Sequence, residues 1–485
     1  MVGIISYGAY IPRKRLQRAA AVEANSWFNP ALKGYSKGER AMCNWDEDAI
    51  TMAVEASRDC LGGETPNDLT GLFLATTSAP FKDRQNAGIL ATALNLGDDL
   101  MTMDVTASQR AGTTGLVNAL KLAEGGGKIL YAAAEKRRTK AAAPQELLYG
   151  DGAAAFVIGS NPGAAEFLGA KQISVDFVDH YKGEGEDFDY HWEERWIRDE
   201  GYMKLVPRAL EGLFADTGVS AGDVTHFVMP CVIRRVGAMV AKTAGIPGEA
   251  ICDNMHNEMG ESGTAHALVM LAKVLETAKP GDIIVIAGFG QGCDAVMFKV
   301  ADNIERCRPQ MGVSGFLARR VEETNYNKYL AFNALVTLEH GLRGEVDRQT
   351  ALTALYRNKE MLTGFIGGKC RKCGTLQFPK TKICVNPNCG EFHSQDDHPF
   401  ADMPATVQSW TADNLTYAVE PPQHFGMVVF EEGGRLMSDI TDVDVGGVEV
   451  GMPMRMMFRV KEFDNQRGFT RYFWKAAPDF TKEDG

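Results

Sequence analysis

The sequence lacks any long hydrophobic run. Its longest apolar stretches, such as IIVIAGFG at 283–290, are far shorter than the roughly 20 residues that span a bilayer. The N-terminal stretch MVGIISYGAYIPRKR also has no apolar core typical of a signal peptide. Positive charge is not in excess, because 51 Lys and Arg stand against 63 Asp and Glu, a net charge of −12. This balance disfavours nucleic acid and anionic membranes as partners.

Cysteine is scarce too. Ten cysteines in 485 residues are too few for a disulfide scaffold. Four of them fall between 370 and 389 and the other six are scattered, a pattern that predicts reduced thiols, one metal site and a cytoplasmic protein. Apolar residues make up 45% and charged residues 24%, which are ordinary globular values. The length predicts two to four domains.

The first 300 residues alternate between apolar, β-rich runs and Ala- and Leu-rich stretches with helical periodicity, which predicts an α/β architecture. We expect helices at 48–61, 112–125 and 262–278, and strands at 3–11, 71–77, 128–135, 153–160, 226–230, 282–288 and 295–300. Two regions of the chain share a similar sequence pattern, which we call an internal echo. The pair KILYAAAE and GDGAAAFVIGS is matched by DIIVIAGFGQGCDAVMFKV. This echo predicts two similar half-domains.

After residue 300 the pattern changes. A polar, helical connector precedes a cysteine-rich segment and then short strands with glycine turns, which together predict a small β-barrel. The expected domains are an N-terminal half at 1–163, a second half at 164–305, a helical connector at 306–360, a zinc ribbon at 361–400 and a barrel at 401–485.

The segment CRKCGTLQFPKTKICVNPNCG carries a predicted structural zinc site. Its ligands are Cys370, Cys373, Cys384 and Cys389, because four thiolates from two Cys knuckles complete a tetrahedral zinc shell. The second knuckle is Cys-x4-Cys rather than Cys-x2-Cys, a small departure that still fits a ribbon. His393 and His398 lie nearby, but four cysteines already fill the shell.

Several motifs of the first 300 residues resemble the thiolase superfamily, nearest to hydroxymethylglutaryl-CoA synthase and the ketoacyl-acyl-carrier-protein synthase III group. They are GIISYGAYIP, AMCNWDEDAITMAVEASRDCL, DVTASQRAGTTGL, YGDGAAAFVIG, MGESGTAHAL and GFGQGCDAVMF. The tail, with PPQHFGMVVFEEGGRLMSDITD and VEVGMPMRMMF, resembles zinc-ribbon and OB-fold proteins that accompany thiolase-like enzymes. The resemblance implies a duplicated, five-layer thiolase-like fold, fused to a zinc ribbon and an OB-type barrel.

The resemblance also shows where this sequence departs from the family. The family's nucleophilic Cys, which precedes a pattern ending in Gly-Thr, corresponds to Gln109; an amide cannot attack a thioester, and Ser108 is one residue early. The family's His corresponds to Cys231 and its Asn to Glu261. The acid/base glutamate of hydroxymethylglutaryl-CoA synthase falls at Thr77. The glycines around these positions are kept.

Without a nucleophile, the resemblance implies chemistry through a thioester enolate on an acyl-CoA. Retro-aldol cleavage of a β-hydroxyacyl-CoA needs a base and stabilisation of the departing enolate, and Glu261 is the expected base. Further candidates are His256, Glu258, His266 and Cys231. Arg110, Arg234 and Gly290 are the expected substrate-binding residues, whereas the basic set Lys136, Arg137, Arg138 and Lys140 is expected to be a solvated loop.

Other functions remain open from the sequence. Residues 1–300 are also consistent with a non-catalytic, CoA-binding scaffold of a thiolase-type acyltransferase complex, or with a condensation of the hydroxymethylglutaryl-CoA synthase type. Decarboxylation is a further variant of the enolate chemistry, less favoured than the aldol reaction. By resemblance the chain is expected to form a homodimer, with a thiolase-type protein as a further partner.

Overall fold

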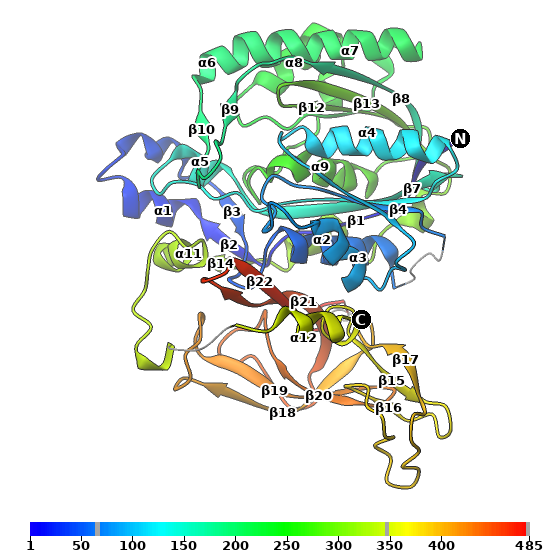
Figure 1. The fold of residues 1–485 in the computed structure, drawn as a ribbon. Helices are drawn as coiled ribbons and strands as arrows, with labels where there is room; N and C mark the ends of the chain where they lie inside the picture. The colour runs from blue at the N-terminus through cyan, green and yellow to red at the C-terminus, as the bar shows by residue number, and fades with distance from the viewer. Residues whose placement is uncertain (64–67, 345–348, 482–485) are drawn as a thin grey trace. The chain divides into compact units, whose positions relative to one another are not determined.

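The computed structural model describes residues 1–63, 68–344 and 349–481 (Figure 1). Its internal contacts divide the chain into two compact units. Unit 1 comprises Met1–Asn44, Asp48–Ala87 and Asp99–Val336. Unit 2 comprises Trp45–Glu47, Gly88–Asp98 and Thr337–Gly485. The two units are described separately.

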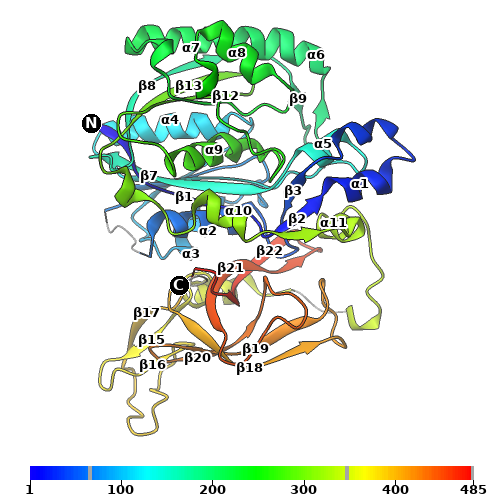
Figure 2. The same ribbon diagram turned by 180° about the vertical axis from the view of Figure 1, so that it is seen from behind.

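Unit 1 is built on nine strands hydrogen-bonded in the order β11-β12-β13-β8-β1-β7-β6-β4-β5. These strands are β1 (Val2–Tyr10), β4 (Gly71–Ala75), β5 (Met101–Val105), β6 (Ile129–Glu135), β7 (Gly152–Ser160), β8 (Ala165–Ser174), β11 (His226–Val228), β12 (Ile283–Phe289) and β13 (Gly292–Val300). Only two residue pairs, Gly3 with Glu166 and Ile4 with Ala165, join β1 to β8. The strands on either side of this short link form two separate layers (Figure 2).

Helices fill the space between the two sheet layers and cover both outer faces. Helices α4 (Ala111–Glu124) and α9 (His266–Leu275) lie between the layers, since α4 contacts both β7 and β13 and α9 contacts both β7 and β12. Helix α7 (Met203–Thr217) covers β8 and β13, and α2 (Ala49–Leu61) covers β1 and β7. This arrangement confirms the five-layer α/β fold expected from the sequence.

The internal echo is confirmed as a repeated structural unit. Strands β6 and β7 form an antiparallel pair from Ile129 with Ile158 to Glu135 with Gly152. Strands β12 and β13 form the matching pair in the other half, from Ile283 with Lys299 to Phe289 with Cys293. Buried on both faces, these strands are almost continuously apolar, as expected of central strands.

Local sequence explains how α2 begins, ends and packs. Asp48 accepts a hydrogen bond from Thr51 N at 2.9 Å and Thr51 Oγ1 accepts one from Asp48 N at 2.8 Å, a reciprocal capping box. Gly62 closes the helix in the left-handed conformation, φ +61°. A side chain at Gly8 of β1 would lie 2.2 Å from Cys60 N, so glycine lets the strand and the helix approach closely.

The remaining elements of unit 1 are shorter. Strand β14 joins β2 and β3 in a small sheet of order β14-β2-β3, a strand within the segment expected to be a helical connector. Their bounds are β2 (Lys14–Gln17), α1 (Arg18–Asn25), β3 (Glu39–Met42), α5 (Pro144–Leu148), β9 (His180–Tyr181), β10 (Tyr190–His191), α6 (Glu194–Trp196), α8 (Val236–Ala244), α10 (Gly312–Ala318), β14 (Val321–Glu323) and α11 (Tyr326–Phe332), with 3-10 turns at Pro30–Tyr35, Ala221–Asp223, Gly248–Ala250, Gly263–Ala265 and Ile304–Cys307.

Unit 2 contains a five-stranded antiparallel barrel and a three-stranded zinc-ribbon sheet. The barrel strands have the order β20-β19-β18-β21-β22, and a bridge between Ile440 and Ala476 brings the strand ends of β20 and β22 together. This confirms the small barrel. The bounds are α3 (Asn86–Ala93), α12 (Leu352–Arg357), α13 (Lys359–Leu362), β15 (Ile366–Cys370), β16 (Leu376–Gln377), β17 (Gln395–Pro399), β18 (Ala405–Asp413), β19 (Gln423–Phe430), β20 (Arg435–Asp439), β21 (Pro453–Asp464) and β22 (Phe469–Pro478), with a 3-10 turn at Leu342–Gly344.

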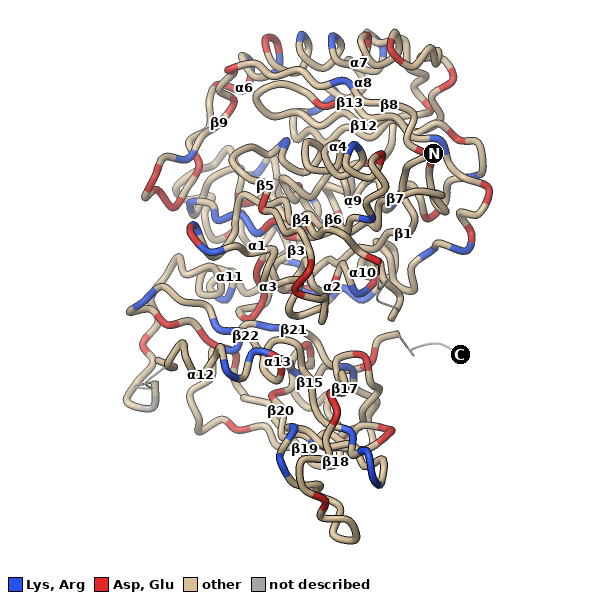
Figure 3. The backbone as a smooth tube through the Cα atoms, turned by 45° about the vertical axis from the view of Figure 1, so that its right-hand side comes forward, with Lys and Arg blue, Asp and Glu red and all other residues tan. Residues whose placement is uncertain are grey.

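Acidic and basic residues are both scattered along the backbone of the two units (Figure 3). Within the described ranges, none of the helices combines the length and the hydropathy that crossing a membrane requires.

Candidate functional site

Three backbone segments of unit 1 meet at the start of α4. Gln109, which the family resemblance predicts to stand at the nucleophile position, lies between β5 and α4. A side chain at Gly112 would lie 2.0 Å from Thr264 O, and one at Gly290 would lie 2.9 Å from Arg110 N. The glycines kept from the family pattern therefore bring the β5–α4 turn, the segment before α9 and the β12–β13 turn together.

The backbone around Glu261 is held by the segment that follows α5. Glu261 N donates to Leu148 O at 2.8 Å, and Gly150 N donates to Glu261 O at 3.0 Å. Side chains are excluded on both segments, because a Cβ at Gly150 would lie 1.7 Å from Met259 O and one at Gly260 would lie 2.6 Å from Tyr149 O. Glu261 is thus fixed by backbone contacts between residues far apart in the sequence.

The Glu261 carboxylate is buried against two histidines. Its Oε2 lies 2.7 Å from His256 Nε2 and 3.8 Å from His266 Nε2. Burial alone would raise the pKa of Glu261, but His266, His256 and Arg137 outweigh it and lower that pKa. The side chain is therefore an ionised carboxylate at neutral pH, next to an imidazole with which it can share a proton.

The partners of His266 fix the tautomer of its neutral form. Its Nδ1 accepts a hydrogen bond from Ser262 N at 3.1 Å, so its Nε2 carries the proton and donates to Asn254 O at 2.8 Å. Complete burial lowers the pKa of His266, opposed by the charge of Glu261. His266 therefore orients Glu261, and His256 is the histidine available for proton exchange with it.

Glu261, His256 and His266 also bring three potential metal-ligand atoms within 4.8 Å of one another. Both nitrogens of His266 are already used, however, one as an acceptor and one as a donor. Binding a metal through Nε2 while Nδ1 keeps its acceptor role would require an imidazolate. The contacts of this cluster fit a proton-sharing group better than a metal centre.

Gln109 is part of a second polar cluster. Its amide lies 3.4 Å from His180 Nε2, and with the amide oxygen turned toward Arg137 it accepts hydrogen bonds from both terminal nitrogens of that guanidinium, the longer at 3.0 Å. Arg137 is buried, pairs with Asp189 and lies 4.3 Å from the centre of the Tyr149 ring. Burial alone would lower the pKa of Arg137, because it disfavours the charged guanidinium. Tyr149, Asp189 and Glu135 outweigh burial and raise this pKa.

The expectation that the basic set is a solvated loop is therefore wrong for Arg137. The other members of the basic set have different contacts from Arg137. Arg138 pairs with Asp187 at 3.2 Å and lies 5.6 Å from the Phe188 ring centre, and Lys140 lies 6.0 Å from the same ring. The loop packs against the segment between β9 and β10, a contact between residues about 50 positions apart.

That segment supplies histidines that the sequence analysis missed. Asp179 Oδ2 lies 2.9 Å from His180 Nδ1, and the rings of His180 and His191 stack with centres 5.6 Å apart. His191 Nε2 lies 3.2 Å from the Tyr149 hydroxyl. Burial, and then the charges of His180 and Arg137, lower the pKa of His191 to about 4. His191 is therefore neutral at pH 7.

A buried acid lies next to Thr77, the residue that the family resemblance predicts at the position of the family glutamate. Glu135, at the end of β6, accepts hydrogen bonds through Oε2 from Thr77 N at 3.1 Å and Thr77 Oγ1 at 3.0 Å. Its Oε1 has no hydrogen-bond partner among the described residues. The sequence analysis missed Glu135 because it reads as the last residue of an apolar strand.

Cys231 is buried beside Tyr202. The Tyr202 hydroxyl is hydrogen-bonded to the thiol, and burial raises the pKa of Cys231 to about 12. Tyr202 ends a π-helix, Ile197–Tyr202, a type of turn that is rare and frequent at functional sites. The Cys231 thiol stays protonated at neutral pH and is therefore a poor nucleophile or base.

The three expected substrate-binding residues have different surroundings. The Arg110 guanidinium pairs with buried Asp294 at 2.8 Å and donates to Gly290 O at 3.0 Å, so it joins the β5–α4 turn to the β12–β13 turn. Arg234 is exposed and donates to Gly34 O at 3.3 Å. No bound substrate contact tests these roles, which stay predictions. Ser108 Oγ donates to Gly290 O at 3.2 Å and supports the same turn.

The four cysteines of the zinc ribbon lie together in unit 2. All four sulfurs are within 4.8 Å of one another, with 3.5 Å between Cys373 and Cys384 and 4.0 Å between Cys370 and Cys389. Tetrahedral Zn–S bonds of about 2.3 Å place sulfurs roughly 3.8 Å apart. The donor set thus fits zinc, and its closed shell makes the zinc structural. Neither His393 nor His398 belongs to this cluster.

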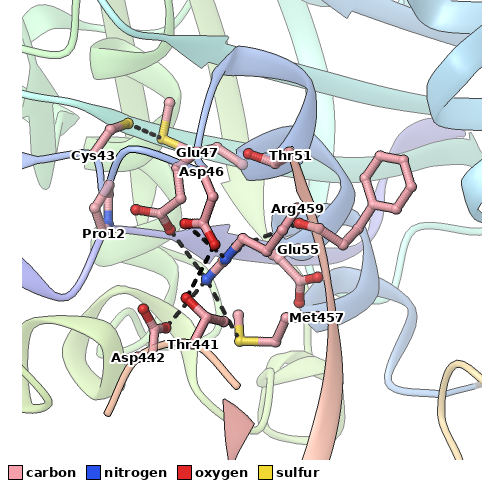
Figure 4. A network of polar contacts seen from close by, with 12 residues as sticks. Pro12, Cys43, Asp46, Glu47, Thr51, Glu55, Thr441, Asp442, Met457 and Arg459 are labelled. Carbon is pink, nitrogen blue, oxygen red and sulfur yellow. Dashed lines mark hydrogen bonds and ion pairs between the residues drawn. The ribbon is translucent and has the colours of Figure 1, made fainter. Parts of the chain in front are cut away.

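Unit 2 also contains a buried group of charges (Figure 4). Asp46 Oδ2 lies 2.9 Å from Lys475 Nζ and accepts a hydrogen bond from Thr441 Oγ1 at 3.1 Å. Arg459, which is fully buried, lies 3.2 Å from Glu47 Oε1 and 3.1 Å from Asp442 Oδ2. The short segment Trp45–Glu47 therefore supplies two of the three carboxylates that neutralise the buried cations.

Three family models match the chain. The C-terminal part of 3-oxoacyl-[acyl-carrier-protein] synthase III matches residues 214–299. The rubredoxin-like zinc ribbon of ChsH2 matches residues 364–393, and the C-terminal OB-fold domain of ChsH2 matches residues 399–459. These matches confirm the zinc ribbon and the OB fold.

Curated relatives decide the family of the larger part. The chain is 30% identical over 352 residues to hydroxymethylglutaryl-CoA synthase of Caldivirga maquilingensis, covering 70% of this chain and 99% of the relative. The enzyme of the same name from Pyrobaculum neutrophilum is 31% identical over 349 residues, covering 70% and 98%. The chain belongs to the hydroxymethylglutaryl-CoA synthase family.

Solved structures agree with this family at the level of the fold. PksG, a hydroxymethylglutaryl-CoA synthase from Bacillus subtilis, aligns with a TM-score of 0.59 at 14% identity, covering 72% of this chain and 95% of PksG. The 3-oxoacyl-(acyl carrier protein) synthase III of Pseudomonas aeruginosa PAO1 aligns with a TM-score of 0.56 at 20% identity, covering 62% and 98%. Within the hydroxymethylglutaryl-CoA synthase family, this chain therefore combines the shared fold with an amide at position 109 and an additional C-terminal unit.

Proposed function

We propose that this member of the family forms or cleaves a carbon–carbon bond of an acyl-CoA through a thioester enolate, without an acyl-enzyme. The preferred reaction is the aldol or retro-aldol reaction of a β-hydroxyacyl-CoA. The names of the curated relatives support a CoA thioester as the substrate class. The first 300 residues bind and react with this thioester in the proposal.

The observation that carries the proposal is the chemistry at the start of α4. Gln109 has no nucleophilic atom there, and its amide is held by Arg137 and His180. The nearby thiol of Cys231 has a pKa raised to about 12 by burial. Covalent catalysis needs an activated nucleophile, and neither residue supplies one.

Glu261 and His256 provide the base that retro-aldol cleavage requires. The pair takes the proton of the β-hydroxyl group, the electrons of the O–H bond form the second bond of the carbonyl, and the C2–C3 bond breaks. The bonding electrons pass to the thioester enolate, which then receives a proton at C2. Arg137, buried and charged, is the candidate for stabilising the enolate oxygen, since a fixed donor in a dry site is worth about 3 kcal/mol.

Intact-protein mass spectrometry and chromatography of CoA products test this reaction. The protein is incubated with acetyl-CoA and a panel of β-hydroxyacyl-CoA thioesters. We expect shortened acyl-CoA and a carbonyl product with no mass added to the protein. A covalent acyl adduct on the wild type contradicts the proposal, and an absence of both adduct and product favours the non-catalytic scaffold.

The variant Gln109→Cys tests the assignment of position 109. If Gln109 stands at the nucleophile position, a cysteine there at the N-terminus of α4 is expected to form an acetyl-enzyme from acetyl-CoA. The matched control is Ser108→Cys, one residue earlier, which is expected to form none. Adduct formation by the control alone places the nucleophile position at 108.

The resemblance also implies an assembly, which we include in the proposal. The chain forms a homodimer, and a thiolase-type protein is its further partner. Light scattering during gel filtration measures the mass of the purified chain. A monomer at micromolar concentration contradicts the homodimer.

A further inference from the structure

We propose that His180, oriented by Asp179, is a second proton-transfer residue of the site and exchanges the proton at the α-carbon of the acyl-CoA. The inference rests on the proposed function, in which the enolate must gain a proton at C2. It assigns that proton to a histidine, while Glu261 and His256 handle the proton of the β-oxygen.

The geometry of the hairpin fixes the direction of the His180 ring. Asp179 Oδ2 accepts from Nδ1 at 2.9 Å, which leaves Nε2 to face Gln109 at 3.4 Å. Asp179 is buried, and hydrogen bonding to His180 outweighs that burial and lowers the pKa of Asp179. An ionised carboxylate behind an imidazole holds the ring in place and stabilises the imidazolium.

Gln109 indicates which form of His180 the site accommodates. The Gln109 oxygen faces the Arg137 guanidinium, since a nitrogen there would meet only donors. The same amide terminus lies toward His180 Nε2, so a protonated Nε2 completes the hydrogen bonds of the oxygen. With Nδ1 donating to Asp179, both ring nitrogens then carry protons. His180 is thus arranged as a proton donor.

Of the two stacked histidines, His180 and His191, only His180 remains as a candidate proton donor. Asp179, His191 and Gln109 contact its ring directly. Arg137 and Asp189 pair with each other, and their charges act on His191 together with that of Asp179. His191, with a pKa lowered to about 4, is neutral at pH 7. His191 is therefore not the proton donor of the stacked pair.

The two carboxylate–histidine pairs share the same surroundings. The Tyr149 backbone forms a bridge with Glu261, and the Tyr149 hydroxyl lies 3.2 Å from Nε2 of His191, whose ring stacks on His180. Both pairs therefore lie around Tyr149. One site thus contains a base-side pair and an acid-side pair, as a reaction with two proton transfers needs.

The proton balance of the retro-aldol reaction assigns one transfer to each pair. The Glu261–His256 pair removes the β-hydroxyl proton, and His180 donates its Nε2 proton to C2 of the enolate. The products are a carbonyl compound and a shortened acyl-CoA. In the aldol direction His180 in its neutral form removes the α-proton. The next cycle requires only proton exchange between the two pairs and water.

Deuterium exchange separates the two roles. Acetyl-CoA or propionyl-CoA is incubated with the protein in D2O, and α-deuterium is measured by mass spectrometry. We expect the wild type to exchange the α-protons and His180→Ala to do so about 10²-fold more slowly or less, a loss typical of a removed acid–base group. Glu261→Gln is expected to keep the exchange but to lose cleavage of the β-hydroxyacyl-CoA.

Three comparisons keep this test specific to His180. Added imidazole is expected to restore exchange to His180→Ala, which a merely structural role of the side chain would not produce. Asp179→Asn serves as a second variant if His180→Ala does not fold, with a smaller loss of exchange. Tyr181→Phe, on the same hairpin and exposed, is the control expected to match the wild type.

The outcomes of the two proposals are distinguishable. Cleavage by the wild type with undiminished exchange and cleavage by His180→Ala overturns the role of His180 and leaves the proposed function intact. Loss of exchange in Glu261→Gln but not in His180→Ala reverses the assignment and likewise overturns it. A wild type that neither cleaves nor exchanges contradicts the proposed function and, with it, the inference.

Discussion

Two buried carboxylates show how differently the two units use charge. Glu261 in unit 1 and Asp46 in unit 2 are 6% and 1% exposed. The partners of Glu261 are His256 and His266, whereas Asp46 lies 2.9 Å from Lys475 and 3.9 Å from Arg459. Burial is similar in the two places, and the chemical difference lies in the cation.

The partner decides whether a buried carboxylate can exchange a proton. An imidazole can accept or donate a proton near neutral pH, and the contact of His256 with Glu261 places one against a buried carboxylate. Lysine and arginine remain protonated at that pH, so the contacts of Asp46 are ion pairs with fixed cations. The first arrangement suits catalysis and the second suits folding, which predicts opposite effects for variants of the two acids.

The largest effect is expected from removing zinc from unit 2. A structural zinc site contributes on the order of 10 kcal/mol of binding free energy to folding in small peptides. Chelation, or Cys384→Ser, is therefore expected to unfold the ribbon segment 366–399. Hydrogen exchange of the amides in this segment measures the unfolding. The amides of unit 1 are expected to keep their protection from exchange. Loss of this protection in β6 and β7 contradicts the prediction that the ribbon unfolds without unit 1.

Asp46→Ala is expected to act on stability. The change leaves Lys475 and Arg459 buried with fewer negative partners, and breaking a buried ion pair in this way costs about 3–5 kcal/mol. Chemical denaturation monitored by fluorescence checks the effect. The matched control is Asp68→Ala, whose partner Lys128 forms an exposed pair, with no measurable loss expected. Equal losses for the two variants contradict the assignment.

Glu261→Gln is expected to act on rate instead. The amide keeps the size of the side chain but cannot accept the substrate proton, so turnover falls about 10²–10⁴-fold. The melting temperature is expected to change by only about 2 °C. A large drop in melting temperature without loss of turnover places Glu261 with Asp46 as a structural acid and removes the contrast between the units.

The smallest expected effect concerns the decrease in the stability of unit 1 at acidic pH. His191 has a folded pKa lowered from 6.5 to about 4, so its contribution is complete above pH 6.5 and is lost as the pH falls toward 4. Below pH 6.5 the unfolded state binds the proton first. In His191→Asn the melting temperature is expected to fall less than in the wild type between pH 7 and pH 5, by about 2 °C. An unchanged pH dependence contradicts a buried neutral His191.

Much of the fold follows from local sequence. The expected strands at 71–77, 128–135 and 282–288 appear as β4, β6 and β12, and the expected helix at 112–125 appears as α4. Strands buried on both faces are continuously apolar and α4 has a helical apolar period, so neighbouring residues carry the signal. The zinc ligands follow for the same reason, because each knuckle is local.

The candidate site followed from the sequence only in part. Glu261 and Gln109 were placed by a motif, and the structure adds partners to both. His180, Asp179 and Glu135 were missed, since none stands in a recognisable spacing. His180 lies 71 positions from Gln109 in the sequence and Glu135 lies 58 positions from Thr77, and such contacts depend on how strands and loops are brought together.

The sequence by itself determined the alternation of strands and helices, the duplicated halves, the four zinc ligands and the amide at position 109. Each is set by neighbouring residues or by a glycine pattern. Only the tertiary structure decided the partner of each buried charge: histidine for Glu261, lysine for Asp46, and Gln109 for Arg137. Whether a buried acid exchanges protons depends on the pKa of the group placed against it, and that neighbour comes from a distant part of the chain.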